Sequence, residues 1–269
     1  MDRALFAAAT GMAAQQANLD TVSNNLANSE VSGFKGASQS FAALAAPGER
    51  GLGTTALGEH VVFTQGKLER SDGPFDLAID GPGFFVVRLG KETAYTRDGE
   101  FSRAADGTLR NALGWQLAGI TIPADASSAK VDASGAVTVT MPTGARTIAN
   151  IRLAQFAAPE HLRAVGGTLF YATGQSGAAR LVTPGANDGP SIRFGMLEQS
   201  NVSIVESMMQ ILAAQRAYEA NAKGVQAAET PDQWKIISTI TTGSTRYCLS
   251  LSDITGKKHS DSVKASNVF

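Results

Sequence analysis

The sequence of 269 residues is poor in cysteine, in aromatic residues and in charge. Its single cysteine, Cys248, excludes an intramolecular disulfide framework and a zinc site built from several cysteines. Charged residues make up 17% of the chain, and the formal net charge is -1. A nucleic-acid binder needs clustered lysine and arginine to neutralise phosphates, whereas the longest basic run here is Lys257–Lys258. We therefore expect no nucleic-acid partner.

The chain also lacks long apolar runs and a secretory leader. No stretch approaches the roughly 18 uninterrupted apolar residues of a membrane-spanning helix, so no membrane span is expected. Residues 1–6 lack the basic region and the compact apolar block of a cleaved signal peptide. The three histidines, His60, His161 and His259, lie far apart in sequence without metal-ligand spacing. No metal and no cofactor are therefore expected.

Signatures of catalysis are weak. The glycine-rich segment 81–83 lacks the strand-to-helix context of a phosphate-binding loop. Hydrolysis by paired carboxylates stays open, because the distance between carboxylates is not visible in a sequence. The candidates lie in the central region and are Asp76, Asp80, Asp98 and Glu100. Because aspartate before glycine is common turn chemistry, we expect that the protein is not an enzyme.

Alanine is abundant but unevenly spread. Of the 43 alanines, 42 lie in residues 1–228, and the remaining 41 residues hold only Ala265. The apolar fraction of 43% is enough for a core, so wholesale disorder is not expected. The change in composition marks 230–269 as an atypical tail, which is most simply explained as a replaced terminus.

A long helix is predicted near the start of the chain, over residues 3–28. Apolar residues recur there every seven positions, which is the period of a coiled-coil seam: Leu5, Met12, Leu19 and Leu26. Helix formers such as alanine and glutamine fill the intervening positions, and residues 28–33 supply stop signals. Because the seam is narrow and rich in alanine, this helix is expected to need a partner helix.

A second helix of similar length is predicted over residues 201–228. Its apolar positions recur every seven residues and at the interleaved 4-3 spacing: Ile204, Met208, Ile211, Tyr218 and Val225. Ser203 and Glu206 form a capping-box pattern at its start. Periodicity alone leaves two interpretations open, a coiled coil between the two helices or two amphipathic helices packed on an ordinary core.

Between the helices the pattern changes to short β-type runs, such as residues 84–87 and 138–141, with closely spaced turn signals. The predicted fold class is α+β, with long N- and C-terminal helices that pair as a coiled coil and a central all-β domain of short antiparallel strands. The expected division is an N-terminal helix and signature over 1–35, an extended connector over 36–59, the β domain over 60–195, the C-terminal helix over 196–229 and the tail over 230–269.

Several motifs resemble those of a known family. Residues 23–28 (SNNLAN) and 32–35 (SGFK) resemble the N-terminal signature of the flagellar axial proteins, the rod and hook family of the bacterial flagellum. Further matches follow in the correct order: 64–68 (TQGKL), 76–85 (DLAIDGPGFF), 94–99 (AYTRDG), 195–202 (GMLEQSNV) and 215–221 (QRAYEAN). The resemblance covers about residues 1–229. Within the family, segments such as 153–156 and 166–170 are most similar to the distal-rod member. The alternative is the proximal-rod paralogue or a hook-type axial protein.

The resemblance implies a structural subunit of a hollow helical rod, the drive shaft that transmits torque from motor to hook. It implies self-association and contacts with the other axial proteins of the proximal rod and hook, with the flagellar export apparatus and with the bushing rings around the rod. It also implies a location in the basal body, in the rod that crosses the periplasm, after export without a cleaved signal peptide. Heterologous contacts that do not close into a ring generate such a filament.

The helix seams predict the residues of the assembly interface. The apolar candidates are Leu5, Met12, Leu19, Leu26, Ile204, Met208, Ile211 and Tyr218. Asn24, Asn25 and Asn28 complete the predicted set, and two roles stay open for them. Their side chains cap the end of the first helix, or they form hydrogen bonds between subunits.

Two departures from the family pattern limit what carries over. The connector over 36–59 is shorter and richer in alanine and glycine than the distal-rod insertion that is associated with rod stiffness. Pro231 interrupts the last helix, because proline biases the residue before it away from the helical region. Two other classes of function also stay open, a secreted β-rich binding module and a hydrolase. The heptads at both ends favour the filament subunit.

Overall fold

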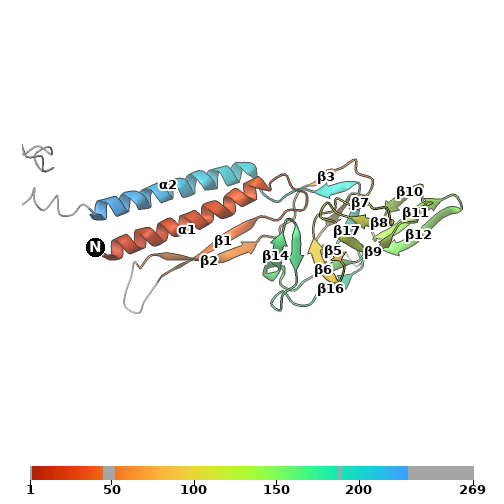
Figure 1. Cartoon of the computed structure of the whole chain (residues 1–269), viewed down its shortest axis with the longest axis horizontal. Helices are drawn as coiled ribbons and strands as arrows, with labels where there is room; N and C mark the ends of the chain where they lie inside the picture. The colour runs from red at the N-terminus through yellow and green to blue at the C-terminus, as the bar shows by residue number, and fades with distance from the viewer. Residues whose placement is uncertain (1, 45–51, 187–188, 230–269) are drawn as a thin grey trace, which may run out of the picture.

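The computed structural model describes residues 2–44, 52–186 and 189–229. The described part is elongated, with two long helices side by side at one end and a large β region at the other (Figure 1). This arrangement fits an α+β class in part. The tail expected over residues 230–269 lies outside the described residues.

The two helices lie where the periodicity predicts them. Helix α1 spans Asp2–Ala27 and helix α2 spans Ile204–Glu229. The Asn28 amide closes the end of α1 by donating to the Asn24 carbonyl oxygen, with its backbone nitrogen at 3.2 Å and its side-chain nitrogen at 2.8 Å. At the start of α2, the Ser203 hydroxyl accepts a hydrogen bond from the Glu206 backbone nitrogen at 3.4 Å, as the capping pattern predicts. Local sequence signals therefore set these two ends.

The predicted pairing of the helices as a coiled coil is wrong. Although α1 and α2 lie side by side, the seam predicted for α2 does not form their contact. Ile204, Met208 and Tyr218 are 41%, 52% and 40% exposed. The buried side chains within the described part of α2 are those of Ser207 and Ala214. A seam of interlocking apolar side chains requires the opposite distribution.

The helices meet instead through small and polar residues. A β-carbon on Gly11 of α1 would lie 2.8 Å from the side-chain nitrogen of Asn221 on α2. Such a short distance means that the missing side chain of Gly11 lets the two helices approach closely at this point. A contact of this kind buries little apolar area. The large apolar side chains of α2 stay exposed, and we return to them below.

A β-hairpin packs on α1 at the side of the helix pair. Its strands are β1 (Ala37–Ala43) and β2 (Thr54–Val61), which pair antiparallel. Residues 36–59, expected to form an extended connector, thus include β1 and most of β2. The Thr10 hydroxyl of α1 accepts a hydrogen bond from the Thr54 backbone nitrogen at 3.3 Å. The hairpin, α1 and α2 run alongside one another in Figure 1.

The central region is built from short strands that pair antiparallel. The strands are β3 (Leu68–Arg70), β4 (Leu77–Asp80), β5 (Phe84–Leu89), β6 (Glu92–Thr96), β7 (Ser102–Arg103), β8 (Thr108–Arg110), β9 (Gln116–Thr121), β10 (Ser128–Val131), β11 (Ala136–Met141), β12 (Gly144–Asn150), β13 (Leu153–Gln155), β14 (Arg163–Gly166), β15 (Leu169–Tyr171), β16 (Arg180–Val182), β17 (Ser191–Phe194) and β18 (Met196–Glu198). The largest sheet has the order β14-β15-β6-β5-β9-β8-β7, and β13 pairs with both β5 and β16. Strands β10-β11-β12 form a three-stranded sheet, β17 pairs with β4, and β18 pairs with β3. A single 3-10 turn, η1 (Pro159–His161), interrupts the strands of the described region.

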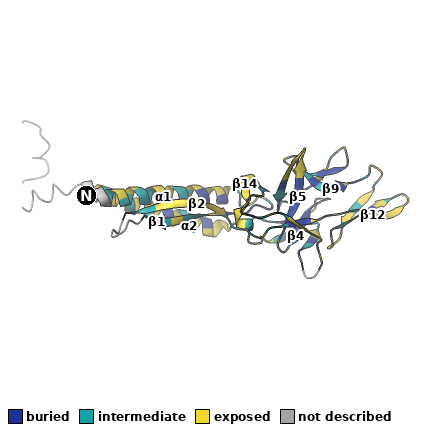
Figure 2. Ribbon diagram, turned by 90° about the horizontal axis from the view of Figure 1, so that it is seen from below, coloured by how far each residue is buried: buried dark blue, intermediate teal, exposed yellow. Residues whose placement is uncertain are grey.

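The hydrophobic core lies in this β region. Figure 2 shows the buried residues gathered around β4, β5 and β9, whereas β2 and β12 are mostly exposed. The main cluster is centred on side chains such as Leu77, Phe85 and Leu117. A second cluster has Phe84, Leu162 and Phe170 as its buried members, and two of these, Leu162 and Phe170, line a pocket together with residues at the end of α1. The β region therefore has the core of an independent unit, and the helices depend on their attachment to it.

Candidate functional site: a buried junction and an acidic groove

Four segments that are distant in sequence meet where the helices join the β region (Figure 1). They are residues 33–37 after α1, 62–67 after β2, 97–99 after β6 and 198–202 between β18 and α2. We refer to these four segments as the junction. Both helices and the hairpin enter the β region through it, so its geometry sets the position of the helical end of the molecule.

Glu198 is the centre of the junction. Its carboxylate forms ion pairs with the Lys35 ammonium at 2.6 Å and with the Arg97 guanidinium at 3.0 Å. It also accepts a hydrogen bond from the Gly66 backbone nitrogen at 2.9 Å. All three charged residues are at least 96% buried. Burial lowers the pKa of the Lys35 amine below its usual value, and the nearby carboxylate of Glu198 opposes that shift.

The buried cluster carries two cations and one anion, and backbone oxygens stabilise the excess positive charge. Lys35 also donates to the Thr64 carbonyl oxygen at 2.8 Å, and Arg97 donates to the Gly81 carbonyl oxygen at 2.7 Å. The Arg97 guanidinium also lies 5.7 Å from the centre of the Phe84 ring. Removing one partner of a buried ion pair costs about 3–5 kcal/mol, because an uncompensated charge stays behind. The cluster thus opposes any separation of its segments.

Two asparagine side chains extend the junction toward the helices. Asn25 of α1 exchanges two hydrogen bonds with the backbone of Ala37, at 2.7 and 2.8 Å. Asn201 accepts from the Gly36 backbone nitrogen at 2.8 Å and donates to the Val62 carbonyl oxygen at 2.7 Å. Each amide satisfies backbone groups that no strand partner reaches. The segments before α2 and after α1 are therefore joined through the same stretch of backbone.

Glycines let the segments of the junction approach one another. A β-carbon on Gly66 would overlap the Gln199 carbonyl oxygen, and one on Gly99 would overlap the Leu77 carbonyl oxygen. Gly33 has φ +70°, a conformation that side chains other than glycine rarely adopt. These positions require glycine because the neighbouring group is rigid backbone, which cannot move aside cheaply.

The predicted apolar interface residues lie on the helices rather than in the junction. On α1, Leu5, Met12, Leu19 and Leu26 are partly buried. On α2, Ile211 is partly buried, and the other three predicted residues are exposed. The structure thus does not bring the two predicted sets together as one interlocked seam.

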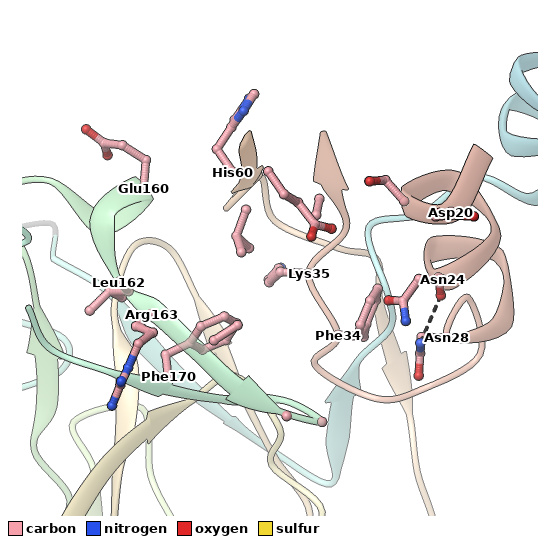
Figure 3. A pocket seen from close by; sticks show the side chains of 17 residues that line it. Asp20, Asn24, Asn28, Phe34, Lys35, His60, Glu160, Leu162, Arg163 and Phe170 are labelled. Carbon is pink, nitrogen blue, oxygen red and sulfur yellow. Dashed lines mark hydrogen bonds between the residues drawn. The ribbon is translucent and has the colours of Figure 1, made fainter. Parts of the chain in front are cut away.

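The three predicted asparagines take different positions. Asn25 is buried and bonds to Ala37 of the same chain. The Asn28 side-chain nitrogen donates a hydrogen bond to the Asn24 carbonyl oxygen at the end of α1, which is a capping contact (Figure 3). The Asn24 side chain is exposed. Within the described chain, two of the three therefore make local contacts.

Lys35, Arg97, Glu198 and Asn201 have no role that the sequence predicts. Each lies inside a motif that carries the family resemblance, but the three motifs that hold them are far apart in sequence. In the sequence, each of these residues is seen only as one charged or amide side chain among small and turn-forming residues. Only the fold shows that these side chains converge.

A groove lies beside the junction, between the end of α1, the end of β2 and the segment from η1 to β15. Its volume is about 620 Å³. Phe34, Leu162 and Phe170 supply apolar lining, and Asp20, Glu59 and Glu160 supply carboxylates. Figure 3 shows Asp20 and Glu160 on opposite sides, with Phe34 and Lys35 between them. We call this the acidic groove.

Three of the carboxylates considered for hydrolysis, those of Asp76, Asp80 and Asp98, form ion pairs or hydrogen bonds with neighbouring groups of the same chain. Asp80 pairs with Arg193 at 2.8 Å, and Asp76 accepts a hydrogen bond from the Ser71 hydroxyl. Burial raises the pKa of Asp98 to about 6. The Asp98 carboxylate accepts a hydrogen bond from the Glu100 backbone nitrogen. Among the described residues, no group of three or more His, Cys, Asp or Glu side chains is placed to hold a metal ion. No helix in the same part of the chain is long and apolar enough to cross a membrane.

The sequence matches three protein-family models in the order of the chain. These are the flagella basal body rod protein over residues 5–35, the flagellar hook protein FlgE/F/G D1 domain over 78–139 and the flagellar basal body rod FlgEFG protein C-terminal over 194–233. Three of the four junction segments, 33–37, 97–99 and 198–202, fall within or beside these matches, and the fourth, 62–67, lies between the first two.

Curated relatives match along most of the chain. The chain is 36% identical over 253 residues to the flagellar basal-body rod protein FlgG of Borreliella burgdorferi, covering 85% of this chain and 96% of the relative. It is 36% identical over 255 residues to FlgG of Caulobacter vibrioides, covering 84% and 95%. The flagellar basal-body rod protein FlgF of Caulobacter vibrioides is 31% identical over 237 residues, covering 83% and 92%. The chain belongs to the flagellar basal-body rod protein family.

Proposed function

We propose that the protein is a structural subunit of the flagellar basal-body rod, of the distal-rod kind, that polymerises into a hollow helical drive shaft. The observation that carries the proposal is the identity of 36% to FlgG over almost the whole length of that relative. The matches include both terminal helices, which a separate β-rich binding module does not need. A position in the proximal rod is the alternative, since FlgF is 31% identical.

In this proposal the protein transmits force and catalyses no reaction. Torque that enters one end of a subunit passes between helices and strands through the junction. A buried ion cluster with backbone hydrogen bonds resists shear there, because each displacement exposes a charge without its partner. The protein then needs no cofactor, and its partners are further copies and the neighbouring axial proteins.

The same proposal assigns the predicted interface residues to contacts between subunits. Ile204, Met208 and Tyr218 are exposed in the single chain, and so are Val205 and Met209 beside them. An exposed apolar stripe on a helix is typical of a surface that a partner covers. We propose that neighbouring subunits cover this stripe in the rod, after export through the flagellar apparatus and inside the bushing rings.

Deletion of the gene tests the proposed function directly. Cells without the protein are expected to lack motility and to form basal bodies without a complete rod. Reintroduction of the full chain restores both. Basal bodies with an intact rod and normal motility in the deletion strain contradict the proposal. A rod that stops before its proximal part is complete assigns the protein to the proximal alternative.

A further inference from the structure

The largest sheet of the β region ends in strands whose outer edges are unpaired. Among the described residues, β14 pairs with β15 alone, and β16 pairs with β13 alone. All four residues of β14 are exposed, and so are Arg180 and Leu181 of β16. The backbone N–H and C=O groups along such an edge are free to pair with a further strand.

The edges of β14 and β16 lie on opposite sides of one sheet. Phe85 of β5 pairs with Thr96 of β6 and with Leu153 of β13, so β6 and β13 lie on different sides of β5. The sheet therefore runs β14-β15-β6-β5-β13-β16, and every neighbouring pair is antiparallel. Because these six strands alternate in direction, β14 and β16 point opposite ways. A second copy that is shifted sideways without being turned over thus brings its β16 antiparallel to β14 of the first copy.

The apolar side chains at the two edges share one face of this sheet. Residues that lie directly opposite one another in an antiparallel pair have their side chains on the same face. The pairs that connect the two edges are Ala164 with Phe170, Phe170 with Tyr95, Tyr95 with Val86 and, two positions along β5, Phe84 with Ala154 and Ala154 with Leu181. Leu181 at one edge therefore lies on the same face as Ala164 and Phe170 at the other.

Both edges carry apolar surface that the single chain leaves in contact with water. Leu181 of β16 is 52% exposed, and Val165 of β14 is 46% exposed. The acidic groove lies along β14, and Ala164 and Phe170 are part of its lining. A strand added to β14 with its Leu181 opposite Ala164 covers apolar area of both copies, which stabilises the pair.

We propose that strand β16 of one copy adds to the free edge of β14 of a second copy of this chain, so that one sheet continues from subunit to subunit. Main-chain hydrogen bonds hold the added strand, and Leu181 packs against Ala164 and Phe170 of the receiving copy. Because the two edges are different surfaces, the contact is heterologous, and such contacts build open helical polymers when they do not close into a ring. The inference rests on the proposed function, since it requires a polymer.

Charge does not oppose this pairing of strands. Each strand carries one charged residue, Arg163 on β14 and Arg180 on β16. When Leu181 lies opposite Ala164 in an antiparallel pair, Arg163 lies opposite Val182, not opposite Arg180. The acidic groove beside β14 adds three carboxylates, whose charge is opposite in sign to that of the added strand. The two strands can therefore meet without placing like charges directly opposite one another.

The remaining free edge of this sheet fits β14 less well. On its other branch the sheet ends in β7, and the path from β14 to β7 has seven strands, all antiparallel to their neighbours. With an odd number of strands, β7 points the same way as β14, so a copy shifted sideways offers it in parallel. Strand β7 also has only two residues, Ser102 and Arg103, and neither is apolar. Direction, length and composition therefore favour β16.

Disulfide formation in assembled rods tests the strand addition. Basal bodies are isolated from cells whose only copy of the full chain carries Ala164→Cys and Leu181→Cys, with Cys248→Ser to remove the native thiol. Within one subunit the two positions are five strand spacings apart, about 24 Å, whereas a disulfide requires α-carbons within about 7 Å. After mild oxidation we therefore expect a ladder of covalent multimers joined between positions 164 and 181. The matched control combines Ala164→Cys with Leu89→Cys, at a residue that is 48% exposed, and is expected to give no ladder.

The outcomes separate the strand addition from the proposed function. Rods that contain the cysteine chain but give no ladder overturn the strand addition and leave the rod function intact. Disulfides that join 164 to 164 or 181 to 181 do the same, because they show a two-fold contact instead of a head-to-tail one. Absence of the unsubstituted protein from basal bodies overturns the proposed function and the strand addition with it.

Polymerisation of the purified full chain provides a second, quantitative test. Leu181→Asp places a carboxylate against Ala164, and we expect it to raise the protein concentration needed for polymerisation about tenfold. Leu89→Asp, at a similarly exposed leucine away from both edges, is the control and is expected to change that concentration less than about twofold. Sedimentation of polymer against total protein concentration measures both, and thermal unfolding checks that the two subunits are equally stable. Equal polymerisation of the two variants overturns the strand addition.

Discussion

The junction and the outer surface of the helix pair differ in which side chains are buried and which are exposed. In the junction, charged and amide side chains are buried and satisfied by partners from four segments. On α2, large apolar side chains such as Met209 and Leu212 are exposed, while small residues form the contact with α1. The usual distribution of polar and apolar residues is thus inverted in both places.

This difference separates what one chain completes from what it leaves for its neighbours. A buried ion cluster has to be satisfied within the subunit, because a missing partner is costly. An exposed apolar stripe destabilises an isolated subunit only slightly. Covering the stripe with a second surface removes apolar area from water and so stabilises the complex. The single chain therefore fixes the orientation of its helical end, and in the proposed rod we expect assembly to stabilise that end.

The largest expected effect is at the centre of the junction. Glu198→Gln removes the carboxylate charge from between Lys35 and Arg97 and is expected to lower the free energy of unfolding by about 3–5 kcal/mol. Urea denaturation of the purified full chain measures it. The matched control is Glu69→Gln, which breaks the exposed pair with Lys67 and is expected to cost less than about 1 kcal/mol. Equal effects of the two substitutions would show that the junction is not the critical contact.

A steric change at the junction is expected to have a smaller effect. Gly66→Ala places a β-carbon against the Gln199 carbonyl oxygen and is expected to cost about 2–3 kcal/mol, because the backbone has to shift. Gly174→Ala is the control, since a β-carbon there meets open space. Thermal unfolding of both variants measures the difference. The steric account fails if Gly66→Ala is as stable as Gly174→Ala.

Asp98, next to Arg97, is expected to make stability depend on pH. Its pKa is raised to about 6 in the folded chain, mainly by burial, so between pH 4 and 6 the folded state binds more protons than the unfolded state. The free energy of unfolding from this group therefore falls as the pH rises through that range. Asp98→Asn is expected to remove this slope and to raise stability at pH 7 by roughly 1–3 kcal/mol.

Denaturation at a series of pH values checks the role of Asp98. The control is Asp125→Asn, at an exposed position, which is expected to keep the slope of the unsubstituted chain. If Asp98→Asn also keeps that slope, the raised pKa does not contribute to stability.

The smallest effect on the isolated subunit is expected on the outer surface of α2. Met209→Gln changes a side chain that is 60% exposed, so the free energy of unfolding is expected to change by less than about 0.5 kcal/mol. Polymerisation is expected to weaken clearly, because the substitution places an amide in an interface. Ala213→Ser on the same helix is the control for both measurements. A loss of subunit stability without a loss of assembly would reverse the contrast between the two regions.

Local signals predict the elements of this fold well and their contacts poorly. The seven-residue period of Leu5, Met12 and Leu19 and the cap at Ser203 predict both helices, because helix formation depends on neighbours in sequence. The period does not reveal which surface of α2 meets α1. Contact at Gly11 depends on how closely two backbones approach, and no periodic pattern records that distance.

The junction is hidden from sequence for a related reason. Lys35 and Glu198 are separated by 163 positions, and each alone resembles an ordinary surface charge. The hairpin over β1 and β2 is also missed, since its strands have no apolar alternation and pack on α1 through small residues. In both cases the structure depends on contacts between residues far apart in sequence, and such contacts leave no local pattern in a single sequence.

Hydrogen exchange of the full chain, compared between the purified subunit and isolated rods, tests the central claim most directly. We predict that backbone amides of residues 62–67 and 97–99 exchange slowly in both states, because the junction is complete within one chain. Amides of α1 and α2 are predicted to exchange much faster in the subunit and to become protected only in the rod. Helices that are as protected in the isolated subunit as the junction, with no change on assembly, would contradict the account.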